Sequence, residues 1–297
     1  MLSYPKLHIF LCPTNFVGIG NVAERIFAGK WIAGARIEDA LRRTRQLNAL
    51  GMSAIINHIG EDLTDKHDIA DAVSTNIRLI KEIKKAKLRA SVSLKLTALG
   101  LRVSRAMARK NYSRIVVEAR KRGVFVWLDA ETQDTIDDAI SIYEGQVARG
   151  GVGITVQAYL RRSGKNLERL AKRKAVVRIV KGAYSESGKI AFVTRKDTTA
   201  NYRSLMHDAF SHLKEFTIAT HDSSLIKEAM LLNRSHRRKV TYAMLNGIRN
   251  GYAAELAEQG NSVAIYVPFG TRWIDYSLRR LREESHLVLM FKSLLGG

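Results

Sequence analysis

The stretch that decides the fold reads Val-Val-Arg-Ile-Val-Lys-Gly-Ala-Tyr and runs from Val176 to Tyr184. Its first part is rich in apolar β-branched residues, which is typical of a buried strand. Arg178 and Lys181 interrupt the apolar run toward its C-terminal end, and Gly182 and Ala183 follow. An isolated buried cation is costly unless it is paired, so folding alone does not call for these two. Two interpretations stay open. The strand end faces a bound anion that approaches the bare backbone, or the strand leaves the core there and both cations are solvated.

Strand-like and helix-like segments alternate on both sides of this stretch. Strands are predicted at 52–57, 91–96, 124–129, 153–158, 176–181, 215–219, 239–244 and 262–267. Helices are predicted at 68–87, 102–122, 135–148, 166–174, 199–213, 223–233, 250–259 and 273–284. About eight strand–helix units at this length predict a (βα)8 TIM-type barrel. A doubly wound open sheet is the competing fold, but no G-x-G-x-x-G follows the first strand.

The same pattern predicts two regions. Residues 1–50 form an N-terminal helical preamble, with helices at 22–30 and 37–50 and Gly51 as a stop signal. Residues 51–297 form the barrel, and the helix at 273–284 lies over its mouth.

Composition limits the class of protein. The chain has 297 residues, 46% of them hydrophobic, and Cys12 is its one cysteine, so an internal disulfide is excluded. No secretory signal and no apolar run long enough to span a bilayer is visible, which favours a cytoplasmic protein. No H-E-x-x-H or other metal signature occurs, so no metal site is predicted.

The net charge of +21 leaves nucleic acid, an anionic membrane surface and acidic ligands open as partners. The basic clusters are spread along the chain and carry no RNA-binding sheet motif, zinc finger or KH signature. Solvated basic helix faces are therefore favoured. A basic nucleic-acid-binding protein on a barrel scaffold is kept as the alternative function.

Polar and charged residues stand at the C-terminal ends of the predicted strands, which converge on the active-site face of a barrel. Lys95 and Asp129 are the most informative, because both follow apolar strands. Paired across the barrel mouth they would compensate each other, as a structural pair or as a zwitterion site. Arg279 and Arg280 stand side by side in the last predicted helix; they suit a carboxylate if that helix crosses the mouth, and otherwise belong to a solvated basic face.

Six motifs, in order, resemble the flavin-dependent proline dehydrogenase family, and the resemblance covers residues 51–284. They are Val92-Ser93-Leu94-Lys95-Leu96-Thr97, Leu128-Asp129-Ala130-Glu131, Gln157-Ala158-Tyr159-Leu160-Arg161-Arg162-Ser163, Arg178-Ile179-Val180-Lys181-Gly182-Ala183-Tyr184, Ala219-Thr220-His221, and Tyr266-Val267-Pro268-Phe269-Gly270 with Arg279-Arg280. The resemblance implies a barrel that carries FAD at its C-terminal face. It also implies oxidation of L-proline to Δ1-pyrroline-5-carboxylate by hydride transfer to flavin N5, with electrons passed to a membrane quinone.

The resemblance also implies roles for individual residues. In the substrate site, Lys95, Arg279 and Arg280 match the carboxylate clamp, and Asp129 matches the carboxylate that pairs with this clamp. Leu245 and Tyr266 match the groups that pack on the proline ring. Glu61 matches the acid that closes the site. Those matching cofactor contacts are Gln157, Arg178, Val180, Lys181, Gly182, Ala183, Thr220, His221 and Glu283.

The chain departs from the family pattern at Ser185, where a tryptophan often stacks on the adenine, and at Asp222 and Asn246. These positions leave FMN open as an alternative to FAD. The apolar tail 286–295 suits a peripheral contact with an anionic membrane, packing on the barrel, or a homo-oligomer contact.

Overall fold

A computed structural model of the chain describes residues 31–184 and 186–272. Its centre is a closed barrel in which eight strands follow one another in chain order, and each neighbouring pair is parallel. The strands are β1 (Ser53–His58), β2 (Ala90–Leu94), β3 (Val126–Leu128), β4 (Val152–Gln157), β5 (Val176–Val180), β6 (Glu215–Ala219), β7 (Lys239–Leu245) and β8 (Ser262–Phe269). The predicted barrel is confirmed, and the open doubly wound sheet is excluded, because β8 pairs with β1.

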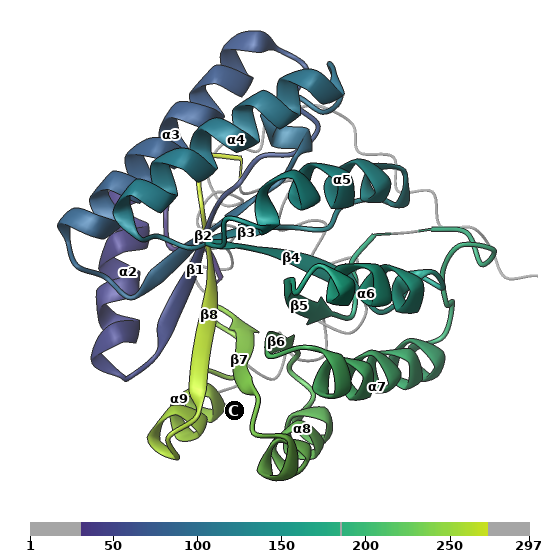
Figure 1. The fold of residues 1–297 in the computed structure, drawn as a ribbon. Coiled ribbons are helices and arrows are strands. Elements are labelled where there is room, and N and C mark those ends of the chain that lie inside the picture. Colours follow the sequence, from purple (N-terminus) through teal and green to yellow (C-terminus); the bar gives the residue numbers. More distant parts are fainter. Residues whose placement is uncertain (1–30, 185, 273–297) are drawn as a thin grey trace, which may run out of the picture.

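Helices surround the barrel as a ring, which Figure 1 shows around the converging strands. They are α2 (Ile37–Ala49), α3 (Lys66–Lys85), α4 (Arg105–Arg122), α5 (Ile136–Val147), α6 (Ser163–Lys172), α7 (Arg195–His212), α8 (Ser223–His236) and α9 (Asn250–Glu258), with short 3-10 turns η1 (Thr97–Leu99) and η2 (Gln133–Thr135).

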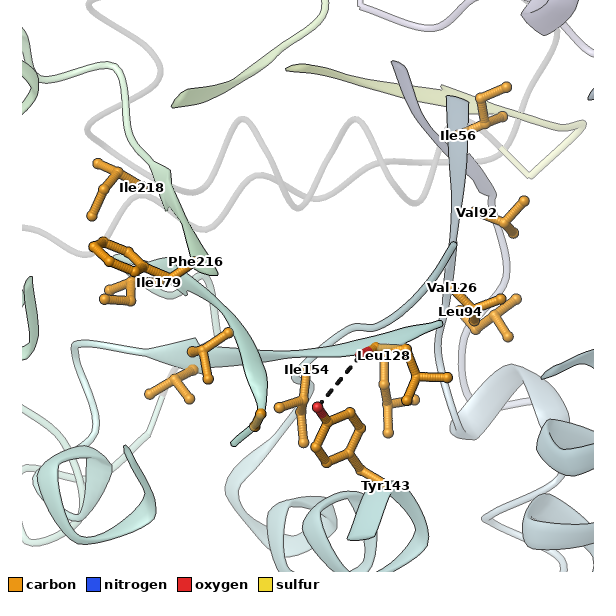
Figure 2. Close-up of a cluster of buried hydrophobic side chains, with 14 of the residues drawn as sticks. Ile56, Val92, Leu94, Val126, Leu128, Tyr143, Ile154, Ile179, Phe216 and Ile218 are labelled. Atoms are coloured by element: carbon orange, nitrogen blue, oxygen red, sulfur yellow. Dashed lines mark hydrogen bonds between the residues drawn. The ribbon is translucent and has the colours of Figure 1, made fainter. Parts of the chain in front are cut away.

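The main core lies between the strands and the helices. Successive residues of a strand point to opposite faces, so every second side chain points outward. Figure 2 shows Ile56, Val92, Ile154 and Ile179 on the outer side of the strands, where they are fully or almost fully buried. The buried Tyr143 of α5 adds a polar link to this layer, because its hydroxyl donates to the carbonyl of Val152 at 3.5 Å.

Helix α2 packs against the outside of β1 and β8. It buries Ile37, Leu41 and Leu47 there. A regular barrel would cover this position with the helix that follows its last strand. The part of the predicted preamble that the structure describes, α2, therefore belongs to the ring of helices around the barrel.

Several boundaries differ from those predicted. β3 is shorter, because the amide of Val124 still bonds to Ala119 and closes the end of α4 after the left-handed Gly123. α7 starts at Arg195, earlier than predicted, because the Thr194 side chain accepts from the backbone N–H of Asp197 and caps the helix. The helices predicted at 22–30 and 273–284 lie outside the described residues.

Candidate functional site

The inward face of the barrel changes from apolar to polar toward the carboxyl ends of its strands. Ile55, Trp127, Ala243 and Ala264 form an apolar cluster inside the barrel. Asp129 follows Trp127 by two residues on the same inward face, and it is buried. Because parallel strands end on one side, the polar inward residues gather at a single mouth.

A buried ion pair joins Asp129 to Arg178 at this mouth. The same Arg178 nitrogen, Nη2, also donates to Ser93 Oγ at 3.1 Å and Thr155 Oγ1 at 3.0 Å. The second Asp129 oxygen, Oδ2, accepts from the Tyr266 hydroxyl at 2.8 Å. A buried charge pair needs such additional hydrogen bonds, since both ions have lost their water. The mouth thus contains one connected network from β2, β3, β4, β5 and β8.

Two aromatic rings complete the surroundings of Arg178. Its guanidinium carbon lies 4.9 Å from the ring centre of Trp127 and 5.6 Å from that of Tyr266, distances typical of cation–π contacts. The interpretation that Arg178 is solvated is wrong: the residue is only 3% exposed. The anion that it faces is the Asp129 carboxylate.

Lys181, the second cation of that strand end, differs in exposure and partner. Its side chain is 31% exposed, and its Nζ lies 3.2 Å from Asp222 Oδ2 and 3.3 Å from Thr199 Oγ1. Burial raises the pKa of Asp222, but hydrogen bonds from Ser224 and Lys181 outweigh it, and the pKa ends below its ordinary value.

The predicted pair of Lys95 with Asp129 is wrong. The Lys95 ammonium pairs instead with Glu61, which lies in the loop between β1 and α3. Glu61 Oε1 also accepts from the Tyr184 hydroxyl at 3.2 Å. The guanidinium of Arg178 pairs with Asp129 instead. The described part of the mouth therefore contains two buried ion pairs, Lys95–Glu61 and Arg178–Asp129, in place of the single Lys95–Asp129 pair that was predicted.

A third carboxylate, Glu131, lies close to Lys95 and is 4% exposed. It accepts from the backbone N–H of Thr97 at 3.1 Å and from the Thr97 hydroxyl. Burial raises the pKa of Glu131, and the opposing effects of Lys95 and the Thr97 hydrogen bonds do not bring it back to its ordinary value.

The last residue of β5 and the backbone that follows it carry four residues that were predicted to contact a cofactor: Val180, Lys181, Gly182 and Ala183. The carbonyl of Val180 accepts from the backbone N–H of Ala158 at 2.8 Å, and that of Lys181 from Tyr159 at 2.8 Å. Gly182 has φ +110°, and a Cβ there would overlap the Tyr159 ring. Glycine was expected because it lets a phosphate approach. The structure gives a second reason, namely the positive φ and the packed Tyr159 ring.

The remaining predicted cofactor residues follow neighbouring strands. Gln157 is buried, and among the described residues its Oε1 has no hydrogen-bond partner. Thr220 is buried and accepts from the backbone N–H of Asp222 at 3.1 Å. His221 Nε2 accepts from the backbone N–H of Leu245 at 3.4 Å. Gln157, Thr220, His221 and Leu245 thus stand on the same carboxyl-end face as Arg178.

Arg279, Arg280 and Glu283 lie outside the described residues. Lys95 is the one predicted member of the carboxylate clamp that the structure describes. The roles assigned to the three others remain predictions.

Three residues that surround Arg178 had no predicted role: Ser93, Trp127 and Thr155. A signal was available, because each stands two positions before a predicted site residue: Lys95, Asp129 and Gln157. A spacing of two places both residues on the same face of a strand.

Within the described part of the chain, one group of His and Asp side chains lies close enough to hold a metal: Asp65, His67 and Asp68. Asp65 caps α3 by accepting from the backbone N–H groups of His67 and Asp68, and Asp68 pairs with Arg272. The closeness of these three residues is therefore accounted for by the N-terminal cap of α3.

The profile of the proline dehydrogenase family matches residues 40–288. The chain belongs to this family. The family, the barrel and the enzyme class predicted from the sequence, an oxidoreductase acting on proline, are confirmed.

Three curated proline dehydrogenases match over most of their length. Proline dehydrogenase 2 of Bacillus subtilis (strain 168) is 30% identical over 293 residues, which cover 96% of this chain and 97% of the relative. Proline dehydrogenase 1 of Bacillus subtilis subsp. natto is 31% identical, with 97% and 98% covered. The proline dehydrogenase of Deinococcus radiodurans is 30% identical, with 89% and 86% covered.

Among solved structures, proline utilization A (PutA) from Bdellovibrio bacteriovorus, inactivated by N-propargylglycine, superimposes with a TM-score of 0.82 at 19% identity. The match covers 89% of this chain and 33% of that one, so this chain spans about a third of the PutA chain. PutA from Bradyrhizobium japonicum gives a TM-score of 0.74 at 21% identity. These likenesses support the fold.

None of the helices in residues 31–184 and 186–272 is both long and apolar enough to cross a membrane.

Proposed function

We propose that this member of the proline dehydrogenase family uses FAD to oxidise L-proline to Δ1-pyrroline-5-carboxylate and passes the electrons to a quinone. The observation that carries the proposal is the buried polar mouth of a family-matched barrel, where Lys95, Asp129, Arg178 and Tyr266 converge. A barrel built only for stability would not need two buried ion pairs at the carboxyl ends of its strands.

The residues at the mouth fit a flavin. Gln157 Oε1 and Arg178 Nη1 are buried, and neither has a hydrogen-bond partner within the described residues. One is an acceptor and the other a donor, and a flavin ring offers both kinds of group. Buried polar atoms are nearly always satisfied in native proteins, so these two support a bound polar molecule.

In this proposal Gln157 and Arg178 hold the flavin ring, and the segment from Val180 to Ala183 holds N5 and the pyrophosphate. Thr220 and His221 give further contacts, and Glu283 reaches the adenosine ribose. A flavin held by these residues would supply the hydride acceptor for proline oxidation. Ser185 removes an aromatic platform from the nucleotide half, so FMN remains the alternative cofactor.

The substrate is a small zwitterion with an apolar ring. Lys95, Arg279 and Arg280 bind its carboxylate, because two guanidinium forks and an ammonium match its charge and shape. Tyr266 and Leu245 provide the wall for the ring. Asp129 keeps the Tyr266 hydroxyl and the Arg178 guanidinium in place. Glu61 closes the site over the clamp.

The Lys95–Glu61 pair affects how the substrate carboxylate binds to the clamp. Glu61 neutralises Lys95 in the described structure. A substrate carboxylate that binds Lys95 therefore competes with Glu61 for this ammonium.

The proposed location is the cytoplasm, with peripheral contact at the inner face of an anionic membrane where the quinone resides. The tail 286–295, which carries the expected membrane or homo-oligomer contact, lies outside the described residues. Co-sedimentation with anionic liposomes, with and without residues 286–297, tests this part of the proposal.

The decisive test is a visible absorption spectrum of the purified protein before and after anaerobic L-proline. We expect a flavin band that bleaches with L-proline and not with D-proline or other amino acids. A flavin band that ignores L-proline would contradict the substrate. A protein without a flavin band, even after reconstitution with FAD or FMN, would contradict the proposal as a whole.

The clamp is tested with Lys95→Met. Losing one charge-assisted contact should weaken proline binding by about 1.5–3 kcal/mol. Unchanged proline affinity would remove Lys95 from the substrate site.

A further inference from the structure

We infer that Glu131 is a positioning residue for the substrate clamp: through Thr97 it holds the loop that sets Glu61 against Lys95. This inference rests on the proposed function, which gives Lys95 its substrate. It assigns a task to a buried acid that the proposed chemistry does not use.

The first step is the contact between Glu131 and Thr97. Both residues are almost fully buried, at 4% and 1% exposure. One carboxylate oxygen, Oε1, accepts from the Thr97 backbone N–H at 3.1 Å, and the other accepts from the Thr97 hydroxyl. Two bonds from one carboxylate fix both the backbone and the side-chain rotamer of Thr97.

The second step is the contact between Thr97 and the loop after β1. The Thr97 hydroxyl oxygen accepts from the backbone N–H of Asp62 at 3.0 Å, and its carbonyl accepts from that of Leu63 at 3.1 Å. A hydroxyl that accepts from Asp62 has its own proton left for Glu131. Thr97 therefore joins the end of β3 to the loop between β1 and α3.

The third step leads to the clamp. Glu61 directly precedes Asp62, and Lys95 stands two residues before Thr97. Both members of the pair Lys95–Glu61 are thus connected to Thr97 by short pieces of chain. A shift of Thr97 would move the ammonium and the carboxylate relative to each other, and misplacement by about 1 Å in a binding site can cost about 100-fold in rate.

Glu131→Met tests the inference, because it keeps the approximate length of the side chain and removes both acceptors. Thr97→Val removes the hydroxyl at nearly constant shape. The conservative variants Glu131→Gln and Thr97→Ser keep an oxygen for Thr97 N–H and a hydroxyl for Asp62 N–H, respectively. The matched control is Thr44→Val, which deletes an equally buried hydroxyl in α2, far from the clamp in sequence, where it bonds to the Ala40 carbonyl at 2.8 Å.

Three quantities are measured for each holoenzyme variant: kcat and KM for L-proline, the Kd of cyclopentanecarboxylate by calorimetry, and hydrogen exchange of the peptide that contains Asp62 and Leu63. Cyclopentanecarboxylate has the ring and carboxylate of proline and lacks the amine, so it probes the clamp without turnover.

We expect Glu131→Met and Thr97→Val to raise KM and Kd about tenfold with a smaller change in kcat, as for loss of uniform binding. Exchange at Asp62 should become faster in both. Glu131→Gln and Thr97→Ser should restore most of the affinity, and Thr44→Val should match the wild type in KM and Kd.

Unchanged KM and Kd in Glu131→Met, or a loss confined to kcat, would overturn the inference. If Glu131→Met does not fold, equal KM in Thr97→Val and Thr97→Ser would overturn it. Failure of the proposed function looks different, because the wild-type protein itself would then show no response to L-proline.

Discussion

At the scale of single residues, the pair of Asp129 and Arg178 is the first place to test. Replacing Asp129 with Leu leaves a buried guanidinium without its carboxylate, which typically costs about 3–5 kcal/mol. Tyr266→Phe removes the hydrogen bond to Asp129, which is worth about 1 kcal/mol. Urea unfolding of the two variants should show this order in the free energy of unfolding.

The control for that series is a surface pair. Arg169 pairs with Glu144 with its side chain 49% exposed, and Arg169→Ala should cost about 0–1 kcal/mol. If Asp129→Leu lowered the free energy of unfolding by no more than Arg169→Ala does, the buried Asp129–Arg178 pair would not stabilise the mouth.

Glu131 gives a prediction with a definite sign in pH. Burial raises its folded-state pKa above the ordinary value of 4.5. Between the two pKa values the folded protein holds a proton that the unfolded chain has lost, so this group stabilises the fold less as pH rises. The free energy of unfolding of the wild type minus that of Glu131→Gln should therefore fall from pH 4.5 upward through the raised pKa.

Glu131→Met serves as the second reference for this measurement, because it also lacks the carboxyl group. The two differences should have the same slope with pH and a different offset. A difference that rises with pH would mean that the hydrogen bonds from Thr97 and the charge of Lys95 outweigh burial.

The sequence predicted which residues lie at the carboxyl ends of the strands but not which partners they contact. The alternation of apolar and polar residues placed Lys95, Asp129 and Arg178 at strand ends. Which carboxylate meets which cation depends on distances across the barrel and on loops such as the one carrying Glu61. Nothing local in the sequence determines those distances.

At the scale of elements, the packing of α2 on the barrel can be tested directly. Leu47 is 1% exposed on the face that packs on the barrel, and Leu50 just beyond the helix is 54% exposed. Leu47→Ala should lower the free energy of unfolding by about 2–5 kcal/mol, whereas Leu50→Ala should change it by less than about 0.5 kcal/mol. Equal effects in chemical denaturation would contradict the packing of α2.

The turn after β5 offers a matched pair of glycines. Gly182 has φ +110° and lies against the Tyr159 ring, whereas Gly145 in α5 has no atom within 4 Å of an added Cβ. Gly182→Ala should destabilise by about 1–3 kcal/mol through strain and overlap. Gly145→Ala should stabilise by about 0.5–1 kcal/mol, because alanine is the better helix former. Thermal unfolding would show the opposite signs, and a stabilised Gly182→Ala would contradict the strained turn.

Elements were easier to predict than their ends. Eight strand-like segments alternating with helices were enough to predict a closed barrel, because period and order are local properties. α7 begins before its predicted start because Thr194 caps the helix, and a cap depends on one side-chain hydrogen bond rather than on the apolar period. That α2 packs on β1 and β8 could not be predicted, since it depends on contacts between distant parts of the chain.

At the scale of the whole molecule, the net charge of +21 is the remaining feature without an assigned role. Several of the described surface cations pair with carboxylates on a neighbouring unit of the barrel. These include the cations in Arg102–Asp134, Arg105–Asp138, Arg162–Asp137 and Arg203–Glu228. These pairs are neutral, so the net charge comes from the excess of 49 Lys and Arg over 28 Asp and Glu residues, which is spread along the chain. Charge spread in this way supports solubility rather than a defined nucleic-acid interface.

We therefore expect any binding to duplex or single-stranded DNA to be weak and confined to low salt. Fluorescence anisotropy of labelled DNA should show binding that disappears by about 0.15 M salt, where the screening length is about 8 Å. Phosphate contacts make affinity fall steeply with salt, by about a thousandfold or more between 50 and 200 mM for a protein with several such contacts. Binding that persists at 0.15 M salt with a preference for one sequence would contradict this expectation, because spread charge alone carries no base readout. The nucleic-acid-binding alternative would then need a defined surface on the barrel, and charge reversal on α4 at Arg109, Lys110 and Arg114 would be the first place to look for it.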